Sequence, residues 1–185
     1  MIIIFRQLYR IIKDGISSLS SDIDGNKTSQ KQLIVFFIII PYFIFGFTYW
    51  LEVNLDNIID TLSSVLSIFT ALIFGVLFTV PDKLSHRIEK LNQKKDNATQ
   101  NYLIRFYNFT KKFVQQTSFI IALSIFLIIL IVFQKVVDNN VPKLILTAIN
   151  CSLFYILIMY VLSILANIYI LLMDDIKMGK DESIT

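Results

Sequence analysis

The stretch FVQQTSFIIALSIFLIILIVFQ, residues 113–134, decides the fold class because it runs for 22 residues without a charge. At about 1.5 Å of rise per residue, a helix of this length crosses the roughly 30 Å hydrocarbon core of a bilayer. Backbone N–H and C=O groups find no water in that core, so they must pair within the segment. The stretch therefore predicts a transmembrane helix.

Three further uncharged blocks occupy much of the remaining chain. They cover residues 33–51, 61–80 and 144–173, for 19, 20 and 30 residues. The 185 residues are 55% hydrophobic and 17% charged, against roughly 45–50% and about 25% in soluble domains. We therefore predict an all-α integral membrane four-helix bundle in one transmembrane domain, residues 33–173. The last block is longer than a bilayer requires, so we expect it to tilt or to protrude.

Residues 1–32 precede the first block and have two parts. The first part is amphipathic, with basic residues on one face and apolar residues on another. The basic positions are Arg6, Arg10 and Lys13, and the apolar ones are Phe5, Leu8, Ile12 and Ile16. This pattern predicts an interfacial helix on the inner leaflet, which acts either as an anchor or as a movable, lipid-sensing element. A polar linker, residues 17–30, follows it.

The distribution of positive charge predicts the orientation of the chain. Residues 1–32, 81–112 and the acidic tail 174–185 hold 15 of the 17 Lys and Arg side chains. The connection 52–60 holds none. Because cytoplasmic connections carry the excess of Lys and Arg, both termini are expected in the cytoplasm. The expected location is a bacterial inner membrane, crossed several times.

Residues 81–112 are predicted to form a basic helical hairpin between the second and third spans. Its candidate contacts for a partner or for anionic lipid are Lys83, Arg87, Lys90, Lys94, Lys95 and Arg105. The hairpin has eight basic and three acidic side chains. This excess of positive charge suits a segment that sets the membrane orientation of the chain and binds anionic lipid. A cytosolic protein partner is an alternative. Nucleic-acid binding is the least favoured reading, because the aromatic residues of the hairpin equally suit packing at a membrane.

Small residues recur every four positions along the second block. They are Ser63, Ser67, Ala71, Gly75 and Thr79. Such spacing puts them on one ridge of a helix, where a second backbone can approach closely. We predict a helix-packing or homo-oligomer interface here, whose partner is either in the same chain or in another copy. A pore lining is the alternative.

Two features of the other spans are candidates for function. Ser152, Tyr160, Ser163 and Asn167 fall within an arc of about 80° on a helix, which predicts a polar stripe facing protein or water. Contacts between helices are its simpler role, and a hydrated path is the alternative. Pro41 lacks the N–H for a helical bond and predicts a kink in the first span, which can serve as a hinge.

The residues needed for catalysis are scarce. The chain has one Cys, Cys151, and one His, His86, and the uncharged blocks contain no acid, base or histidine. We find no nucleophile with a partner base and no phosphate-binding or metal-binding motif. We therefore expect a protein that is not an enzyme and binds no cofactor or metal. The absence of charges from the spans also argues against a proton- or sodium-coupled transporter.

The architecture resembles that of the small membrane subunits of bacterial phage-defence operons, such as the Kiwa-type membrane subunit. The likeness lies in the short chain, the four spans with both termini inside, and the basic helical connection between the second and third spans. It implies a homo-oligomeric sensor or relay working with a cytosolic, DNA-binding effector. Alternatives of the same shape are an oligomeric pore that depolarises the membrane and an immunity or scaffold subunit.

Overall fold

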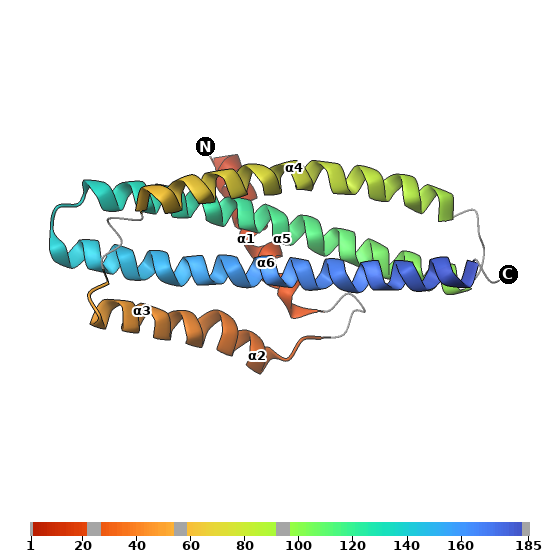
Figure 1. Ribbon diagram of the computed structural model, residues 1–185, viewed down its shortest axis with the longest axis horizontal. Coiled ribbons are helices and arrows are strands. Elements are labelled where there is room, and N and C mark those ends of the chain that lie inside the picture. The colour runs from red at the N-terminus through yellow and green to blue at the C-terminus, as the bar shows by residue number, and fades with distance from the viewer. Residues whose placement is uncertain (1, 22–26, 54–58, 92–96, 183–185) are drawn as a thin grey trace.

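The computed structural model describes residues 2–21, 27–53, 59–91 and 97–182 (Figure 1). For residues 2, 76, 78–91, 97–103, 171 and 174–182 it describes only the backbone. The elements are α1 (Ile2–Ser17), η1 (Ser18–Ser20), α2 (Gln30–Ile34), η2 (Val35–Ile39), α3 (Ile40–Trp50), α4 (Ile59–Leu91), α5 (Asn97–Val136) and α6 (Asn140–Glu182). All elements of the described chain are helical, which confirms the all-α class.

Three described helices are long and apolar enough to cross a membrane: Gln30–Trp50, Ile104–Val136 and Asn140–Ile170. They contain the predicted spans 33–51 and 113–134 almost entirely, and most of 144–173. The described side chains of α4 form a shorter apolar helix, Ile59–Gly75. The remainder of the predicted span 61–80 lies largely outside the described side chains, although its backbone is helical.

The long helices pack in the order α4, α5, α6, α3, each lying against the next (Figure 1). Helices α4, α5 and α6 are successive antiparallel neighbours. Helix α3 contacts α6 on the side away from α5 and has no extensive contact with α4 in the described residues. The four-helix bundle expected from the sequence is therefore not confirmed, because among the long helices α3 packs mainly on α6.

The main apolar core lies where α4, α5 and α6 meet. Leu66 of α4, Leu123 and Leu127 of α5, and Leu157 of α6 belong to one buried cluster. Because lipid is as apolar as these side chains, close packing rather than exclusion of water holds such helices together in a membrane. Helix α5 contacts α4, α6, α1 and η1, whereas Phe126 and Ile129 on its remaining face are exposed.

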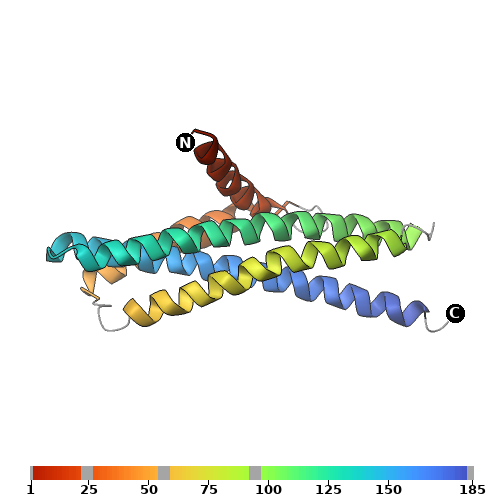
Figure 2. The same ribbon diagram turned by 90° about the horizontal axis from the view of Figure 1, so that it is seen from above.

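Helix α1 leaves the long helices at a steep angle (Figure 2). Its described contacts with the long helices are made with α5. Its apolar side chains near the N-terminus remain uncovered, and Ile3, Ile4 and Phe5 are 65–72% exposed. The predicted interfacial helix is therefore attached to α5 near its own C-terminal end, and its depth in a bilayer stays a prediction.

The helices extend beyond the predicted spans at the cytoplasmic end of the expected topology. The backbone of α4 continues through Pro81 to Leu91, and α5 begins at Asn97. Both arms of the predicted hairpin are therefore helical, whereas their connection lies outside the described residues. The backbone of α6 continues to Glu182, so most of the acidic tail extends this helix instead of forming a separate segment.

Candidate functional site at the junction of α1, η2, α5 and α6

Two of these elements, η2 and α5, contact one aromatic side chain of α6, Tyr160, which is 1% exposed. Its ring centroid lies 5.4 Å from that of Phe37 in η2, in an edge-to-face arrangement with an interplanar angle of 70°. On another side it lies 4.5 Å from the ring of Phe119 in α5. Aromatic pairs at these distances contribute about 0.5–1.5 kcal/mol beyond the area they bury. We call Phe37, Phe119 and Tyr160 the aromatic junction.

Helix α1 reaches the aromatic junction through Gly15, which is buried against Phe119. A Cβ atom built at Gly15 would lie 2.5 Å from Cβ and 2.7 Å from Cγ of Phe119. Real Cβ atoms do not tolerate such distances, so only glycine lets the α1 backbone lie here without moving the ring. The contact attaches α1 to the middle of the long helices.

Pro41 lies one turn beyond Phe37, and the backbone around it is irregular. It supplies no N–H to the carbonyl of Phe37, and the preceding residues Val35–Ile39 form a π-helical turn. The Ser152 hydroxyl lies 3.0 Å from the Pro41 carbonyl oxygen and 2.9 Å from Ala148 O, and its single proton is shared between these two acceptors. The predicted kink site is therefore held by α6, while its action as a hinge stays a prediction.

The structure directs the predicted polar stripe of α6 toward other helices. Ser152 contacts α3, and Tyr160 is the centre of the aromatic junction. Ser163 accepts a hydrogen bond from Gln116 Nε2 of α5 over 3.2 Å. Asn167 is 9% exposed. The four residues thus lie against protein, as a polar stripe in lipid requires.

A second polar cluster was not identified from the sequence. Gln134 Nε2 donates to Thr147 Oγ1 over 2.8 Å, and Asn150 Nδ2 donates to Gln134 Oε1 over 2.8 Å. All three residues are at most 3% exposed. The sequence does show two amide side chains, Gln134 and Asn150, in otherwise apolar segments. Because the spans are defined by the absence of charged residues, that criterion does not distinguish an amide from an aliphatic side chain.

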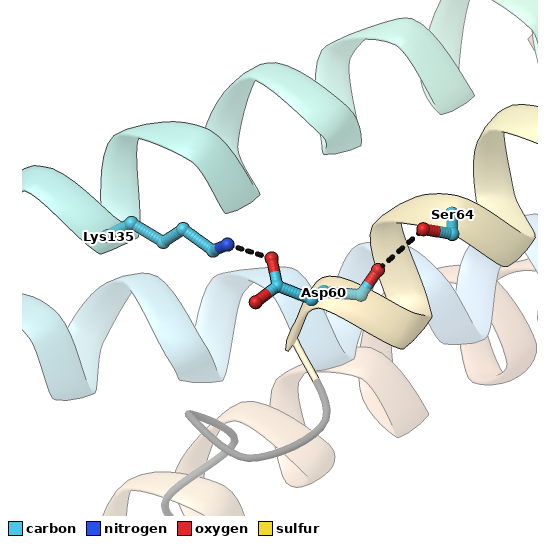
Figure 3. Close-up of polar contacts among 3 residues, drawn as sticks. All are labelled: Asp60, Ser64 and Lys135. Carbon is cyan, nitrogen blue, oxygen red and sulfur yellow. Dashed lines mark hydrogen bonds and ion pairs between the residues drawn. The ribbon is translucent and has the colours of Figure 1, made fainter.

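An ion pair joins α4 to α5 near the opposite end of the molecule from the hairpin (Figure 3). The Lys135 ammonium contacts the Asp60 carboxylate, and the Ser64 hydroxyl donates to the Asp60 carbonyl over 2.9 Å. The side chains of Asp60 and Lys135 are 81% and 43% exposed, so solvent screens the pair and its energy is small. The ion pair does, however, place the start of α4 beside the end of α5.

The predicted small-residue ridge points away from the described helices. Ser63 is partly buried, whereas Ser67, Ala71 and Gly75 are exposed, and a Cβ at Gly75 would meet nothing within 4 Å. The Ser67 hydroxyl donates to Ser63 O over 2.8 Å, which satisfies it within its own helix. Three of the four ridge residues with described side chains are thus exposed. The side chain of Thr79 lies outside the described residues.

Most of the predicted basic contacts of the hairpin also lie outside the described side chains. They are Lys83, Arg87, Lys90, Lys94 and Lys95. Arg105 on α5 is partly buried. The most enclosed basic residue of the described part is Lys112, which is 9% exposed and donates to the carbonyl of Ser21. This contact connects the polar linker to α5.

The described residues contain no group of three His, Cys, Asp or Glu side chains able to hold a metal ion. Comparisons with protein-family models, with curated proteins and with solved structures find no match to this chain.

Proposed function

We propose that the chain is a four-span protein of a bacterial inner membrane that works without catalysis, as the sensor or relay subunit of an antiviral defence system. Its α1 helix is the element that responds to a change in the membrane. The helical extension of α5 passes the response to a cytosolic partner. The resemblance to small membrane subunits of phage-defence operons supports the biological part of this proposal.

The observation that carries the mechanism is the continuous contact from α1 to the kink site. Gly15 lies against Phe119, Phe119 lies against Tyr160, and Tyr160 lies against Phe37, one turn before Pro41. The apolar side chains at the start of α1 are exposed and suited to lipid. A displacement of α1 must therefore move Phe119 or break the Gly15 contact, because there is no spare space between them.

Helix α5 supplies the path from this contact to the hairpin. It is one continuous helix of 40 residues, and Phe119 lies about 33 Å along it from Asn97 at about 1.5 Å per residue. Lys112 adds a second attachment, since it holds the linker through Ser21. A rotation or shift of α5 at either contact carries its cytoplasmic arm with it.

The homo-oligomer is part of the same proposal. The uncovered positions Ser67, Ala71 and Gly75 are small, and their side chains allow a second helix to approach closely. Two differently tagged copies, expressed together and extracted in mild detergent, are expected to co-purify. Recovery of only the tag used for capture contradicts the oligomer.

A phage challenge tests the relay. Cells that express the chain with its neighbouring genes are compared with cells that carry Gly15→Leu, and with the matched control Gly46→Leu. Gly46 has open space at its Cβ position, whereas Gly15 has none. We expect Gly15→Leu to lower protection at least about tenfold, the effect of roughly 1.4 kcal/mol on an equilibrium, and Gly46→Leu to keep it. Equal protection by both variants contradicts the relay, and no protection by the unaltered genes contradicts the defence role.

An oligomeric pore is the second candidate, and one observation favours it. Thr117 Oγ1 and Ser124 Oγ lie on one face of α5, are buried, and have no hydrogen-bond partner in the described structure. Unsatisfied hydroxyls in a span suit a path that becomes hydrated. Ion flux from liposomes that contain the purified protein tests it, and vesicles that stay sealed contradict it.

A further inference from the structure

A cavity of about 530 Å³ opens beside the polar linker, between α2, η2, α5 and α6. It lies at the ends of the apolar segments that the charge distribution assigns to the cytoplasmic leaflet. Lys27 and Ser29 of the linker and Gln32 of α2 are among the lining residues. Phe37 of the aromatic junction forms part of its inner wall.

Several polar lining residues lie near the cytoplasmic ends of the predicted spans. Lys112 and Asn167 enter from α5 and α6, and Lys27 and Ser29 enter from the linker. Both lysines carry a positive charge, and Lys112 also donates to the Ser21 carbonyl. An ammonium group and hydroxyl and amide donors around a shared space are the groups that bind a phosphate.

Asn167 is the clearest sign that the cavity takes a ligand. It is 9% exposed, and its side-chain amide makes no hydrogen bond within the described structure, although it lines the cavity. A polar ligand group in the cavity can therefore pair with this amide. Ser163, one helical turn away, is already the acceptor of Gln116 and needs no further donor.

Other lining residues are apolar. They include Leu33 and Phe37 from the first span, and Met159 and Leu162 from α6. Met159 lies about 12 Å along α6 from Asn167, in the direction of the predicted membrane centre. The cavity therefore changes from polar to apolar along the direction in which a lipid changes from head group to acyl chain.

We propose that this cavity binds an anionic phospholipid of the inner leaflet, with its phosphate at Lys112, Asn167 and Lys27 and an acyl chain along Phe37, Met159 and Leu162. The site is separate from the basic residues predicted on the hairpin, and it does not depend on the relay. The bound lipid lies against Phe37 and so reaches the aromatic junction.

Native mass spectrometry of the full-length protein, released from detergent with added lipid, tests the site. Phosphatidylglycerol, zwitterionic phosphatidylcholine and inorganic phosphate are titrated separately. We expect phosphatidylglycerol to bind at least about tenfold more tightly than phosphatidylcholine, since one charge-assisted hydrogen bond is worth about that factor. Millimolar phosphate displaces the lipid only if the phosphate group alone is recognised, and a failure to displace it shows that the acyl chain contributes.

The matched variants are Lys112→Met and Lys111→Met. The two lysines are adjacent in the chain, but Lys112 is buried at the cavity whereas Lys111 is exposed. We expect Lys112→Met to weaken binding of phosphatidylglycerol about tenfold and Lys111→Met to leave it unchanged. Binding of phosphatidylglycerol is also measured for Asn167→Leu and Lys27→Met. These two variants provide the test if Lys112→Met does not fold. Equal loss in the two lysine variants, full binding by Asn167→Leu and Lys27→Met, or equal affinity for the two lipids overturns the proposal.

Discussion

Gly15 is the residue at which the described structure tolerates the least change. Its role depends on the position of Phe119, which lies more than a hundred residues further along the chain. The sequence shows only a glycine near the end of an amphipathic helix, a place where glycines commonly end helices. The close approach of two backbones through this residue required the packed structure.

We expect Gly15→Ala to detach α1 from α5, because the added methyl group overlaps Phe119. Overpacking of this kind costs about 1–3 kcal/mol. Hydrogen exchange of the α1 amides and thermal unfolding in detergent measure the change. Gly46→Ala is the control, since its Cβ meets open space and the helix gains up to about 1 kcal/mol in propensity. If the α1 amides of Gly15→Ala exchange as slowly as those of the control, the contact is not what holds α1.

At Thr117 we expect a substitution to raise the stability of the protein instead of lowering it. Its buried hydroxyl has no partner and borders an otherwise apolar cavity of about 180 Å³. Thr117→Val keeps the shape and removes the unsatisfied group, so we expect a gain of up to about 1 kcal/mol in stability. Thermal unfolding in detergent measures it. A clear loss of stability shows that the hydroxyl has a partner, such as a water molecule, and strengthens the hydrated-path candidate.

At the scale of the elements, the sequence predicts the polar stripe of α6 but not the second polar cluster, which joins α5 to α6. The stripe was found because its four members share one face of a single helix. Gln134 and Asn150 lie on different helices, so no periodicity within either segment connects them. Pairing across helices depends on how α5 and α6 are aligned, which only packing determines.

We expect Asn150→Leu to lower the stability of the α5–α6 pair, because it leaves Gln134 Oε1 without its donor. Hydrogen bonds between membrane helices contribute about 0.6–2 kcal/mol. The double variant with Gln134→Leu is expected to recover part of the loss, since it removes both polar groups. Chemical or thermal unfolding of the four proteins of the cycle measures the coupling. Additive losses would mean that the two amides do not interact.

At the scale of the whole molecule, the charge pattern predicts which end faces the cytoplasm, and the structure groups the helix ends. The ion pair of Asp60 and Lys135 puts the start of α4 beside the end of α5 (Figure 3). Both residues lie in the regions that the distribution of Lys and Arg assigns to the outer side. The contact is consistent with that assignment and independent of it.

Cysteine labelling tests the orientation. In a Cys151→Ser background, a membrane-impermeant maleimide is expected to label Asp60→Cys and Lys135→Cys in intact cells. Lys94→Cys in the hairpin connection is expected to react only after lysis. The opposite pattern inverts the topology, and a split between positions 60 and 135 contradicts the antiparallel packing of α4 and α5.

The sequence by itself determined that the chain is helical and apolar enough for a membrane, and where the apolar segments lie, because hydrocarbon solvent forces backbone pairing within each segment. Only the tertiary structure decided which helices touch. It placed α3 on α6, left Ser67 and Ala71 of α4 exposed, and brought Gly15, Phe119, Tyr160 and Phe37 together. In lipid the apolar faces of a helix have nearly equal solvation energy, so hydropathy carries no information about partners. Steric fit and a few buried hydrogen bonds determine which helices pack together.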